Sequence, residues 1–324
     1  MKHFSKITAL TAMLILSIAA VAKPQNVRLL YWNIQNGMWA DQGNNYDKFV
    51  DYVLGVNPDI CVWCEAKTHY KTGTSESFKM TDELYLPAHW ADLAARYGHS
   101  YVYVGGERDF FPQVITSRYP IENVERIVGS EDDVMVSHGA GWARMCIGGK
   151  TINIVTMHTW PQKYNFGIER DDAAAIEKSG KLREGDTYRR REVEYVCKHT
   201  ILTDKNASKH LWLMMGDMNS KWRGDNARYH HAPDHTLWQA QDYIHNNTPY
   251  IDIVDKWFGP ENFQPTHYNS SRIDYVYCTK SLYKRVQGVE VVRTGWPANY
   301  KIKESAKGFC YPSDHFPIIV DFSL

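Results

Sequence analysis

The sequence lacks the features that divide a chain into independent parts. Its 324 residues contain no Pro/Gly/Ser-rich linker, no internal repeat and no block of like charge. Because large layered domains reach this length, we expect a single domain over residues 23–324. The chain also lacks net charge, since 37 basic residues balance 37 acidic ones. A neutral total neither supports nor excludes nucleic acid as a partner, because a local basic groove can coexist with it.

The N-terminal apolar stretch, residues 7–20, is too short for a comfortable membrane span. Lys2 and Lys6 precede it, and Ala20-Val21-Ala22 offers a small-residue cleavage site. This pattern predicts a signal peptide over residues 1–22. No cysteine follows the stretch where a lipoprotein would carry its lipid. We therefore expect a mature protein that is secreted or periplasmic, monomeric and without a transmembrane segment, with an anchored protein as the alternative.

Cysteine motifs typical of zinc sites are also scarce. Cys61 and Cys64 form a C-x-x-C pair, but no second such pair lies nearby. On a strand, positions three apart point to opposite faces, so these two thiols cannot readily bridge each other. We interpret them as small buried hydrophobes, with zinc binding or redox use as the alternative.

Five apolar runs end in, or begin with, residues that can hold a divalent cation or a phosphate. They span residues 29–33, 60–65, 152–158, 211–219 and 313–320. Buried strands appear as apolar runs, and ligand sites of layered α/β proteins form where strand ends open into a crevice. We therefore expect these ends to meet at one mouth.

The residue types at that mouth limit the chemistry. Glu65 with Asn33 is an all-oxygen set, which a hard cation such as Mg²⁺ prefers. The other polar residues supply a carboxylate that can orient water, an amide donor and an imidazole, which together fit metal-assisted attack on phosphorus. They are Asp217, Asn219, Asp314 and His315.

Asp274 begins the run 272–277 and is a natural partner for His315. A carboxylate on one imidazole nitrogen fixes the tautomer and stabilises the protonated ring. These two residues start their runs, whereas Asn33, His158 and Asp217 end theirs. Both sets reach one mouth only if the last strands run antiparallel to the earlier ones, which predicts a mixed-sheet, two-layer core with helices outside.

Helical periodicity appears in three places. Residues 46–54 carry an apolar stripe, with Asn44 or Asn45 as the N-terminal cap and Gly55 as the end, and residues 87–97 and 193–201 carry two more. Short strands are predicted at 101–104, 114–116, 121–128 and 140–147. Residues 159–187 form a long aromatic-containing segment directly after His158, which we interpret as a wall or lid over the substrate, with a plain surface excursion as the alternative.

In their order along the chain, these motifs resemble those of the endonuclease/exonuclease/phosphatase superfamily, which has the DNase I-like fold. The resemblance covers residues 27–322. Its motifs are Asn33 with Asn36-Gly37, Glu65, the segment 117–121, His158, the segment 216–219, the segment 272–275 and the segment 313–315. The resemblance implies an α+β fold: a four-layer αββα sandwich with two mixed, largely antiparallel β-sheets.

The resemblance also implies a metal centre. Glu65 would be the principal ligand, with Asn33 beside it and Asp314 at the same pole. The metal would be Mg²⁺, for which Mn²⁺ can substitute. Some relatives carry an acidic residue two positions after the strand-ending Asn, where this chain has Gln35. We therefore expect no metal ligand at that position.

Catalytic roles follow from the same resemblance. His315 paired with Asp274 would bind the phosphate or act as the base. Asp217 would orient the attacking water. Asn219 with His158 would hold the phosphoryl oxygens as charge develops.

The function that these expectations indicate is an exported, Mg²⁺-dependent hydrolase of phosphodiester bonds. Its partner would be a phosphoester substrate, with nucleic acid as the leading candidate. The alternatives are a sphingomyelinase-type phospholipase, a phosphomonoesterase acting on a small phosphorylated substrate, and a catalytically silent binding module.

Overall fold

The computed structural model describes residues 24–68, 89–109, 111–130, 132–299 and 310–324. The predicted signal peptide and the expected start of the second helix at Pro87 lie outside these ranges. Within them, no helix combines the length and the apolar character that crossing a membrane requires.

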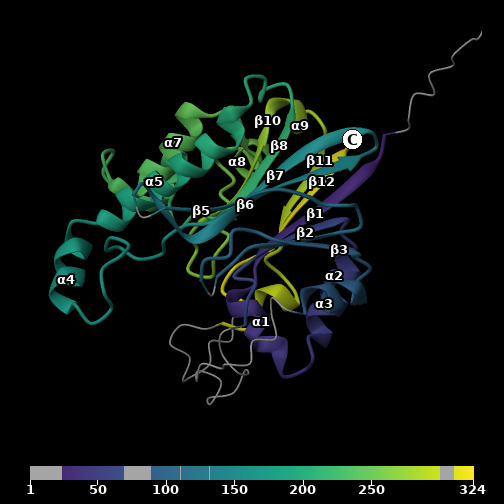
Figure 1. Ribbon diagram of the computed structural model, residues 1–324, viewed down its shortest axis with the longest axis horizontal. Helices are drawn as coiled ribbons and strands as arrows, with labels where there is room; N and C mark the ends of the chain where they lie inside the picture. Colours follow the sequence, from purple (N-terminus) through teal and green to yellow (C-terminus); the bar gives the residue numbers. More distant parts are fainter. Residues whose placement is uncertain (1–23, 69–88, 110, 131, 300–309) are drawn as a thin grey trace, which may run out of the picture.

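Two six-stranded sheets form the centre of the molecule (Figure 1). The first has the order β11-β12-β1-β2-β4-β3, and the second has the order β5-β6-β7-β8-β10-β9. The strands of the first sheet are β1 (Asn26–Asn33), β2 (Ile60–Cys64), β3 (Tyr101–Val104), β4 (Val114–Ser117), β11 (Val286–Val291) and β12 (Ile318–Ser323). Those of the second are β5 (Glu122–Gly129), β6 (Met135–Ile147), β7 (Lys150–His158), β8 (Leu211–Asp217), β9 (Tyr250–Asp252) and β10 (Asp274–Thr279).

The pairing directions are those that the strand-end pattern predicts. β1 and β2 are parallel, as are β7 and β8, whereas β12 is antiparallel to β1 and β10 is antiparallel to β8. The starts of the late strands therefore lie beside the ends of the early ones. The predicted fold class, a DNase I-like sandwich with two mixed sheets, is confirmed.

The central strands are apolar throughout because both of their faces are buried. On β1, Leu29 and Tyr31 point into the core between the sheets, while Leu30 and Trp32 point to the outer core. Alternating residues thus enter different cores, so the sequence shows a continuous apolar run rather than an alternation. The core between the sheets fixes the relative position of the strand ends that carry the polar residues.

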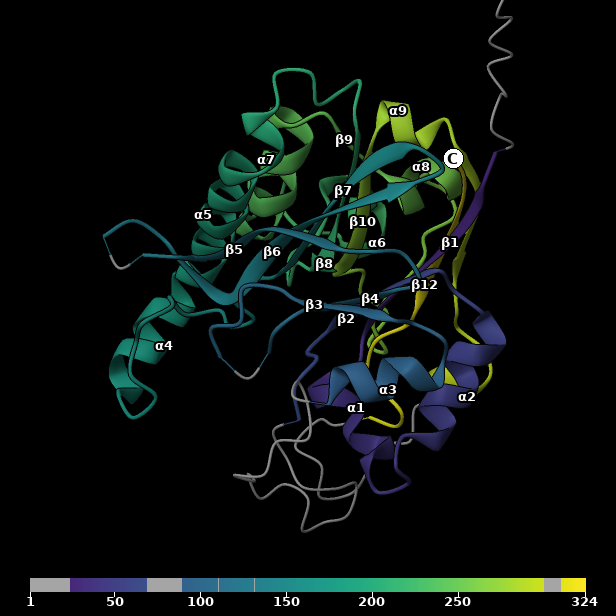
Figure 2. The same cartoon turned by 45° about the vertical axis from the view of Figure 1, so that its right-hand side comes forward.

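Helices cover the outer face of each sheet (Figure 2). α1 (Gln35–Gln42), α2 (Asp47–Val56) and α3 (Trp90–Arg96) accompany the first sheet. α5 (Glu184–His199) and α7 (Gln239–Asn247) pack on the second, where Val196 and Ile244 join Val155 and Met214 in one cluster. The remaining helices are α4 (Ala173–Lys181), α6 (Asn226–Tyr229), α8 (Ile253–Phe258) and α9 (Lys280–Tyr283).

The first predicted helix is correct in place and wrong in detail. α2 buries Phe49, Val50 and Val53, as the stripe predicts, but Leu54 is 51 % exposed. The stripe continues in sequence beyond the part of the helix that contacts the sheet. Its start is also different: Tyr46, in a left-handed conformation, precedes the helix in place of an Asn cap, and the C-cap residue is Asn57 rather than Gly55.

The predicted positions of Cys61 and Cys64 are confirmed. Cys61 lies in the outer core under α2 and α3, and Cys64 lies in the core between the sheets. The two thiols therefore point to opposite faces of β2 and form no bridge with each other.

Candidate active site

The predicted site residues converge on one end of the sandwich. They come from the ends of three neighbouring strands in each sheet: β12, β1 and β2 in the first, and β7, β8 and β10 in the second. A cavity of about 420 Å³ opens there. Its lining includes Glu65, His158, Asp217, Asn219, Asp314 and His315. Asn33 and Asp274 lie beneath it and contact these residues.

Asn33 connects the two sheets at the floor of the cavity. Its side-chain amide lies 3.2 Å from Glu65 Oε1 and 3.1 Å from Asp217 Oδ2, and it donates to both. The second oxygen of Glu65 accepts the backbone N–H of Asn36 at 3.0 Å. Three polar groups from separate strand ends are thereby held in one arrangement before any ligand binds.

The backbone after these strands is bent to present the polar groups. Glu65 and Asn36 both have left-handed conformations, with φ of 56° and 55°. Gly37 follows with φ of 67°, and a Cβ atom there would lie 2.8 Å from the backbone nitrogen of Thr68. Only glycine fits this close approach without displacing the backbone. Such conformations cluster at functional sites. Here they turn the Glu65 carboxylate and the backbone N–H of Asn36 toward each other.

Asp217 and Asn219 line the cavity at the end of β8, in the second sheet. Asp217 Oδ1 accepts the backbone N–H of Asn219 at 2.9 Å, which fixes the carboxylate in a tight turn at the end of β8. The side-chain amide of Asn219 donates one hydrogen to the Thr159 carbonyl at 3.1 Å, and its second hydrogen remains for a ligand. His158, at the end of β7, places Nε2 3.7 Å from Asp217 Oδ2.

His315 and Asp274 form a buried dyad. His315 Nδ1 lies 2.7 Å from Asp274 Oδ2, and the other Asp274 oxygen accepts the Tyr31 hydroxyl at 2.7 Å. Trp32 Nε1 donates to the His315 carbonyl at 2.9 Å, and the Ser313 hydroxyl donates to the Asn33 carbonyl at 2.7 Å. The end of β1 therefore positions a segment almost three hundred residues away. His315 Nε2 is left facing Asp217 and Asp314, each at 3.7 Å.

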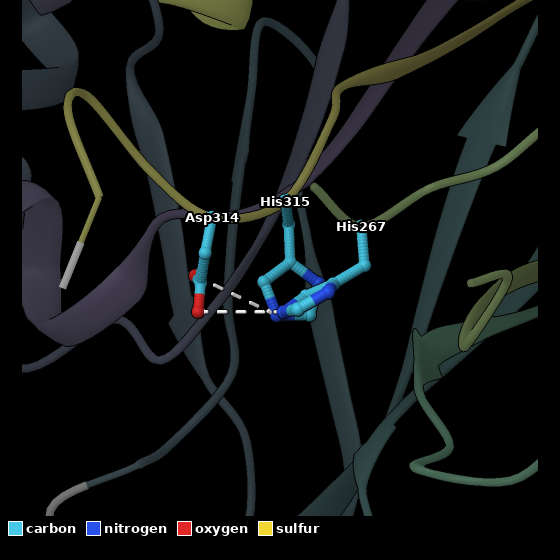
Figure 3. A group of neighbouring side chains, drawn as sticks. All are labelled: His267, Asp314 and His315. Carbon is cyan, nitrogen blue, oxygen red and sulfur yellow. Dashed lines mark ion pairs between the residues drawn. The ribbon is translucent and has the colours of Figure 1, made fainter. Parts of the chain in front are cut away.

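Asp314 has a second imidazole neighbour that the sequence analysis missed. The carboxylate of Asp314 faces both His267 and His315, and His267 Nε2 lies 3.5 Å from Asp314 Oδ2 (Figure 3). Ligand atoms of the three side chains lie within 4.8 Å of one another, a spacing that could hold a metal ion. His267 reaches this position because its backbone forms an isolated bridge with His315. That pairing of two loops leaves no periodicity in the sequence.

Burial and charge shift the pKa values of the two central histidines in opposite directions. Burial lowers the pKa of His158, and the rings of His138 and His315 lower it further. Burial also acts to lower the pKa of His315, but the Asp274 and Asp314 carboxylates outweigh it, so the pKa lies well above the usual value. One cavity thus contains two imidazoles whose pKa values are shifted in opposite directions, an arrangement typical of sites that separate acid and base roles.

The carboxylates also have shifted pKa values. Burial, with a contribution from the Asp274 carboxylate, raises the pKa of Asp217 to about 8. Burial likewise raises the pKa of Glu65, and the nearby Asp314 adds to this rise. Burial acts to raise the pKa of Asp314 too, but the rings of His315 and His267 lower it below the ordinary value.

The donor set fits a hard divalent cation. Glu65 and Asp314 repel each other electrostatically, and Oδ1 of Asp314 is buried without a hydrogen-bond partner among the described residues. A cation would relieve both the repulsion and the unsatisfied oxygen. Carboxylate and amide oxygens are the kind of ligand that a hard divalent cation prefers. Asn33 now turns its NH2 group to Glu65 and Asp217, and its Oδ1 accepts the backbone N–H of Gln35 at 3.0 Å, so its side chain would have to turn to offer the oxygen to an ion. Glu65, Asp314 and Asn33 would hold such an ion.

The family model for the endonuclease/exonuclease/phosphatase family matches residues 30–315. The chain belongs to the endonuclease/exonuclease/phosphatase family. The members of this family hydrolyse phosphoesters and are typically dependent on a divalent metal. The matched range extends across both sheets and includes the predicted site residues from Asn33 to His315.

Solved structures of family members have the same fold. An AP endonuclease from Archaeoglobus fulgidus is 17% identical with a TM-score of 0.59, and the match covers 92% of this chain and 100% of that one. The human Nocturnin catalytic domain with bound sulfate is 14% identical with a TM-score of 0.57, covering 93% of each chain. A 3′ phosphatase, NExo from Neisseria, bound to a product DNA hairpin, is 15% identical with a TM-score of 0.55, covering 92% and 100%. No curated protein sequence matches the chain.

Family motifs do not include the wall of the cavity, which the structure reveals. The segment after His158 is tied to α5 by the buried side chain of Glu192, whose oxygens accept the N–H groups of Ser137 at 2.7 Å and Trp160 at 2.9 Å. The guanidinium of Arg189, which is also buried, donates to the carbonyls of Trp160 at 2.7 Å and Gln162 at 2.9 Å. The start of the predicted wall or lid is therefore a fixed wall.

Proposed function

We propose that this family member is an exported, Mg²⁺-dependent phosphoesterase that hydrolyses phosphodiester bonds, with nucleic acid as the leading substrate class. One observation carries the proposal. The predicted carboxylates, imidazoles and amides of six strand ends gather at a single cavity: Glu65, His158, Asp217, Asn219, Asp314 and His315 line it, and Asn33 and Asp274 are hydrogen-bonded to residues of this set. Concentrating negative charge in this way has an electrostatic cost, which a bound cation would offset.

The chain's own residues divide the work. The imidazolium of His315, held by Asp274, directs Nε2 into the cavity, where its proton can bind a phosphoryl oxygen. Asn219 and the neutral ring of His158 face the same space and would hold the oxygens that gain charge during attack. Asp217 lies between both rings and would orient the attacking water. A divalent cation at Glu65, Asn33 and Asp314 would neutralise phosphoryl charge as a Lewis acid.

Hydrolysis of phospholipid has less support. That function needs an exposed apolar hairpin or lid that reaches the lipid. The aromatic side chains after His158 instead pack on one another and on α5: Trp160 contacts Phe166 with ring centroids 5.1 Å apart, and Phe166 stacks on Tyr188 at 5.1 Å. The side chains that would have to enter a bilayer are used to build the wall.

A substrate panel tests the proposal. Single-stranded DNA, duplex DNA, RNA, bis(p-nitrophenyl) phosphate and p-nitrophenyl phosphate would each be incubated with the mature protein and Mg²⁺, Mn²⁺ or EDTA. We expect hydrolysis of a diester that requires the metal and is lost in His315→Ala. Folded protein that hydrolyses none of these substrates, or that hydrolyses them equally well in EDTA, would contradict the proposal. Faster cleavage of the monoester than of every diester would instead support the phosphomonoesterase alternative.

A further inference from the structure

A second aspartate–histidine pair lies in the wall of the same cavity. His138 Nδ1 is 2.6 Å from Asp109 Oδ2, and the His138 side chain is 4 % exposed. Its ring packs against that of His158, with centroids 4.3 Å apart and an interplanar angle of 37°. Both rings line the cavity, together with Phe111 and Gln162. Neither Asp109 nor His138 belongs to a motif that the sequence analysis singled out.

The pair is held rigidly from several sides. Asp109 uses its other oxygen, Oδ1, to accept the backbone N–H of Phe111 at 2.9 Å, so the carboxylate cannot turn away from His138. The residue before His138 is fixed through both backbone groups: Ser137 N–H donates to Glu192, and the Ser137 carbonyl accepts Arg108 Nε at 2.8 Å. A side chain whose backbone and ring nitrogen are both fixed has its remaining nitrogen aimed in one direction.

That remaining nitrogen has no partner. Nε2 of His138 is buried and forms no hydrogen bond with any described residue. Buried polar atoms are almost always satisfied, so an unsatisfied one in the wall of a binding cavity indicates a ligand atom. The Asp109 carboxylate can only accept, so the proton of this contact lies on Nδ1. A phosphate oxygen beside Nε2 would be matched by a ring that carries a second proton there, opposite the charge of Asp109. In that form Nε2 is a donor that suits an anionic oxygen.

We propose that His138 Nε2–H binds an anionic phosphate oxygen of the substrate, as an additional substrate-binding residue beside His158, and that Asp109 is its positioning residue. This inference rests on the proposed phosphoesterase function. The contact adds one charge-assisted donor to those of His315 and Asn219. This contact favours substrates whose phosphate directs an oxygen toward His138, on the side of the cavity that Phe111 and Gln162 also line.

Binding of inorganic phosphate to the mature protein with Mg²⁺, measured by calorimetry, tests this directly. We expect His138→Leu to weaken phosphate binding by about tenfold or more, the usual scale for a charge-assisted hydrogen bond. His138→Gln places an amide donor near the position of Nε2 and should recover most of the affinity. Asp109→Asn should fall between the wild type and His138→Leu.

A matched control is present elsewhere in the chain. His210 Nδ1 also lies 2.6 Å from an aspartate, Asp204, but the His210 side chain is 56 % exposed and neither residue lines this cavity. His210→Leu should leave the phosphate affinity within twofold of the wild type. Thermal unfolding of each variant separates a structural role from a binding role, because a merely structural His138 would lower the melting temperature and leave the affinity unchanged.

Phosphate binding tests the role of His138, and hydrolysis tests the proposed function, so the two can fail separately. Wild-type phosphate affinity in folded His138→Leu would overturn the inference, as would a His138→Gln variant that binds no better than His138→Leu. Wild-type protein that binds no phosphate would overturn it too, even if a diester is hydrolysed. Protein that binds phosphate through His138 but hydrolyses no phosphoester would support the subsite and contradict the proposed function.

Discussion

Glu65 is the residue on which the proposed chemistry depends most. Its carboxylate is fixed by Asn33 and by the backbone of Asn36, and its left-handed conformation turns it to the cavity. We expect Glu65→Gln to lower kcat/KM with Mg²⁺ by roughly a hundredfold or more, because a Lewis-acid contribution of several kcal/mol depends on this charge. Steady-state kinetics would measure it. Glu290→Gln, an exposed substitution on β11, should retain wild-type activity, and equal activity of Glu65→Gln would contradict the assignment.

Asp274 controls the charge of His315, and the sign of the effect follows from the pKa shift. The pKa of His315 is raised above its unfolded value of about 6.5. Protonated His315 therefore stabilises the fold fully below about pH 6.5, and this contribution is lost as the pH rises through the folded-state pKa. In Asp274→Asn the pKa of His315 should fall. The stability that the wild type gains from protonated His315 relative to this variant should therefore shrink as the pH rises from about 6.5 through the folded-state pKa.

Nitrogen NMR of the imidazole rings in metal-free protein measures this shift. The His315 ring should remain an imidazolium at pH 7 in the wild type and titrate at lower pH in Asp274→Asn. Tyr31→Phe is the matched control, since it removes a hydrogen bond to the same carboxylate and keeps the charge. Identical titration of His315 in the wild type and Asp274→Asn would show that the dyad does not set its protonation.

At the scale of elements, α5 determines the shape of the cavity by holding its wall. Glu192 is fully buried and accepts two backbone N–H groups, one from β6 and one from the segment after His158. Glu192→Leu should lower the free energy of unfolding by about 2–6 kcal/mol, because it leaves two buried N–H groups without an acceptor and each costs about 1–3 kcal/mol. Urea unfolding would measure it.

Glu194 provides the control on the same helix. It forms ion pairs with Arg190 and Lys198 on the helix surface, and surface pairs contribute little. Glu194→Leu should cost under about 1 kcal/mol. A similar cost for Glu192→Leu and Glu194→Leu would mean that the wall is not anchored through Glu192.

The same elements show what a sequence can predict. Strand ends such as Asn33 and Asp217 were predictable because a buried strand leaves a continuous apolar run that stops at a polar residue. The antiparallel direction of β10 and β12 followed from whether Asp274 and His315 start or end their runs. The prediction that Leu54 is buried was wrong, because periodicity describes a helix face and not how much of that face another element covers.

Other parts of the site could not be predicted because they depend on contacts between loops. His267 enters the site through a backbone bridge to His315, and His138 pairs with Asp109 across 29 positions. Each of these histidines alone has the appearance of an ordinary surface or core residue. Glu192 sits among apolar helix positions, and its two acceptor contacts arise only when β6 and the segment after His158 pack on α5.

For the whole molecule, the N-terminal sequence predicts where the protein is located. The charged start, the apolar stretch 7–20 and the Ala20-Val21-Ala22 site support export to the periplasm or the medium. We expect the exported protein to begin at Lys23. Intact-mass spectrometry of protein recovered outside the cytoplasm would show it, and a mass corresponding to Met1 would contradict export by cleavage while leaving the active-site proposal unaffected.

Early and late segments of the chain meet at the site, since Asn33 and Glu65 follow the first sheet's early strands β1 and β2 and Asp314 precedes its last strand, β12. We propose that a divalent metal binds at this meeting point. Anomalous diffraction from a crystal of the mature protein soaked in Mn²⁺ tests it most directly. A manganese peak in contact with Glu65 and Asp314 is the predicted result, whereas manganese bound only elsewhere, or no peak at this end of the sandwich, would contradict it.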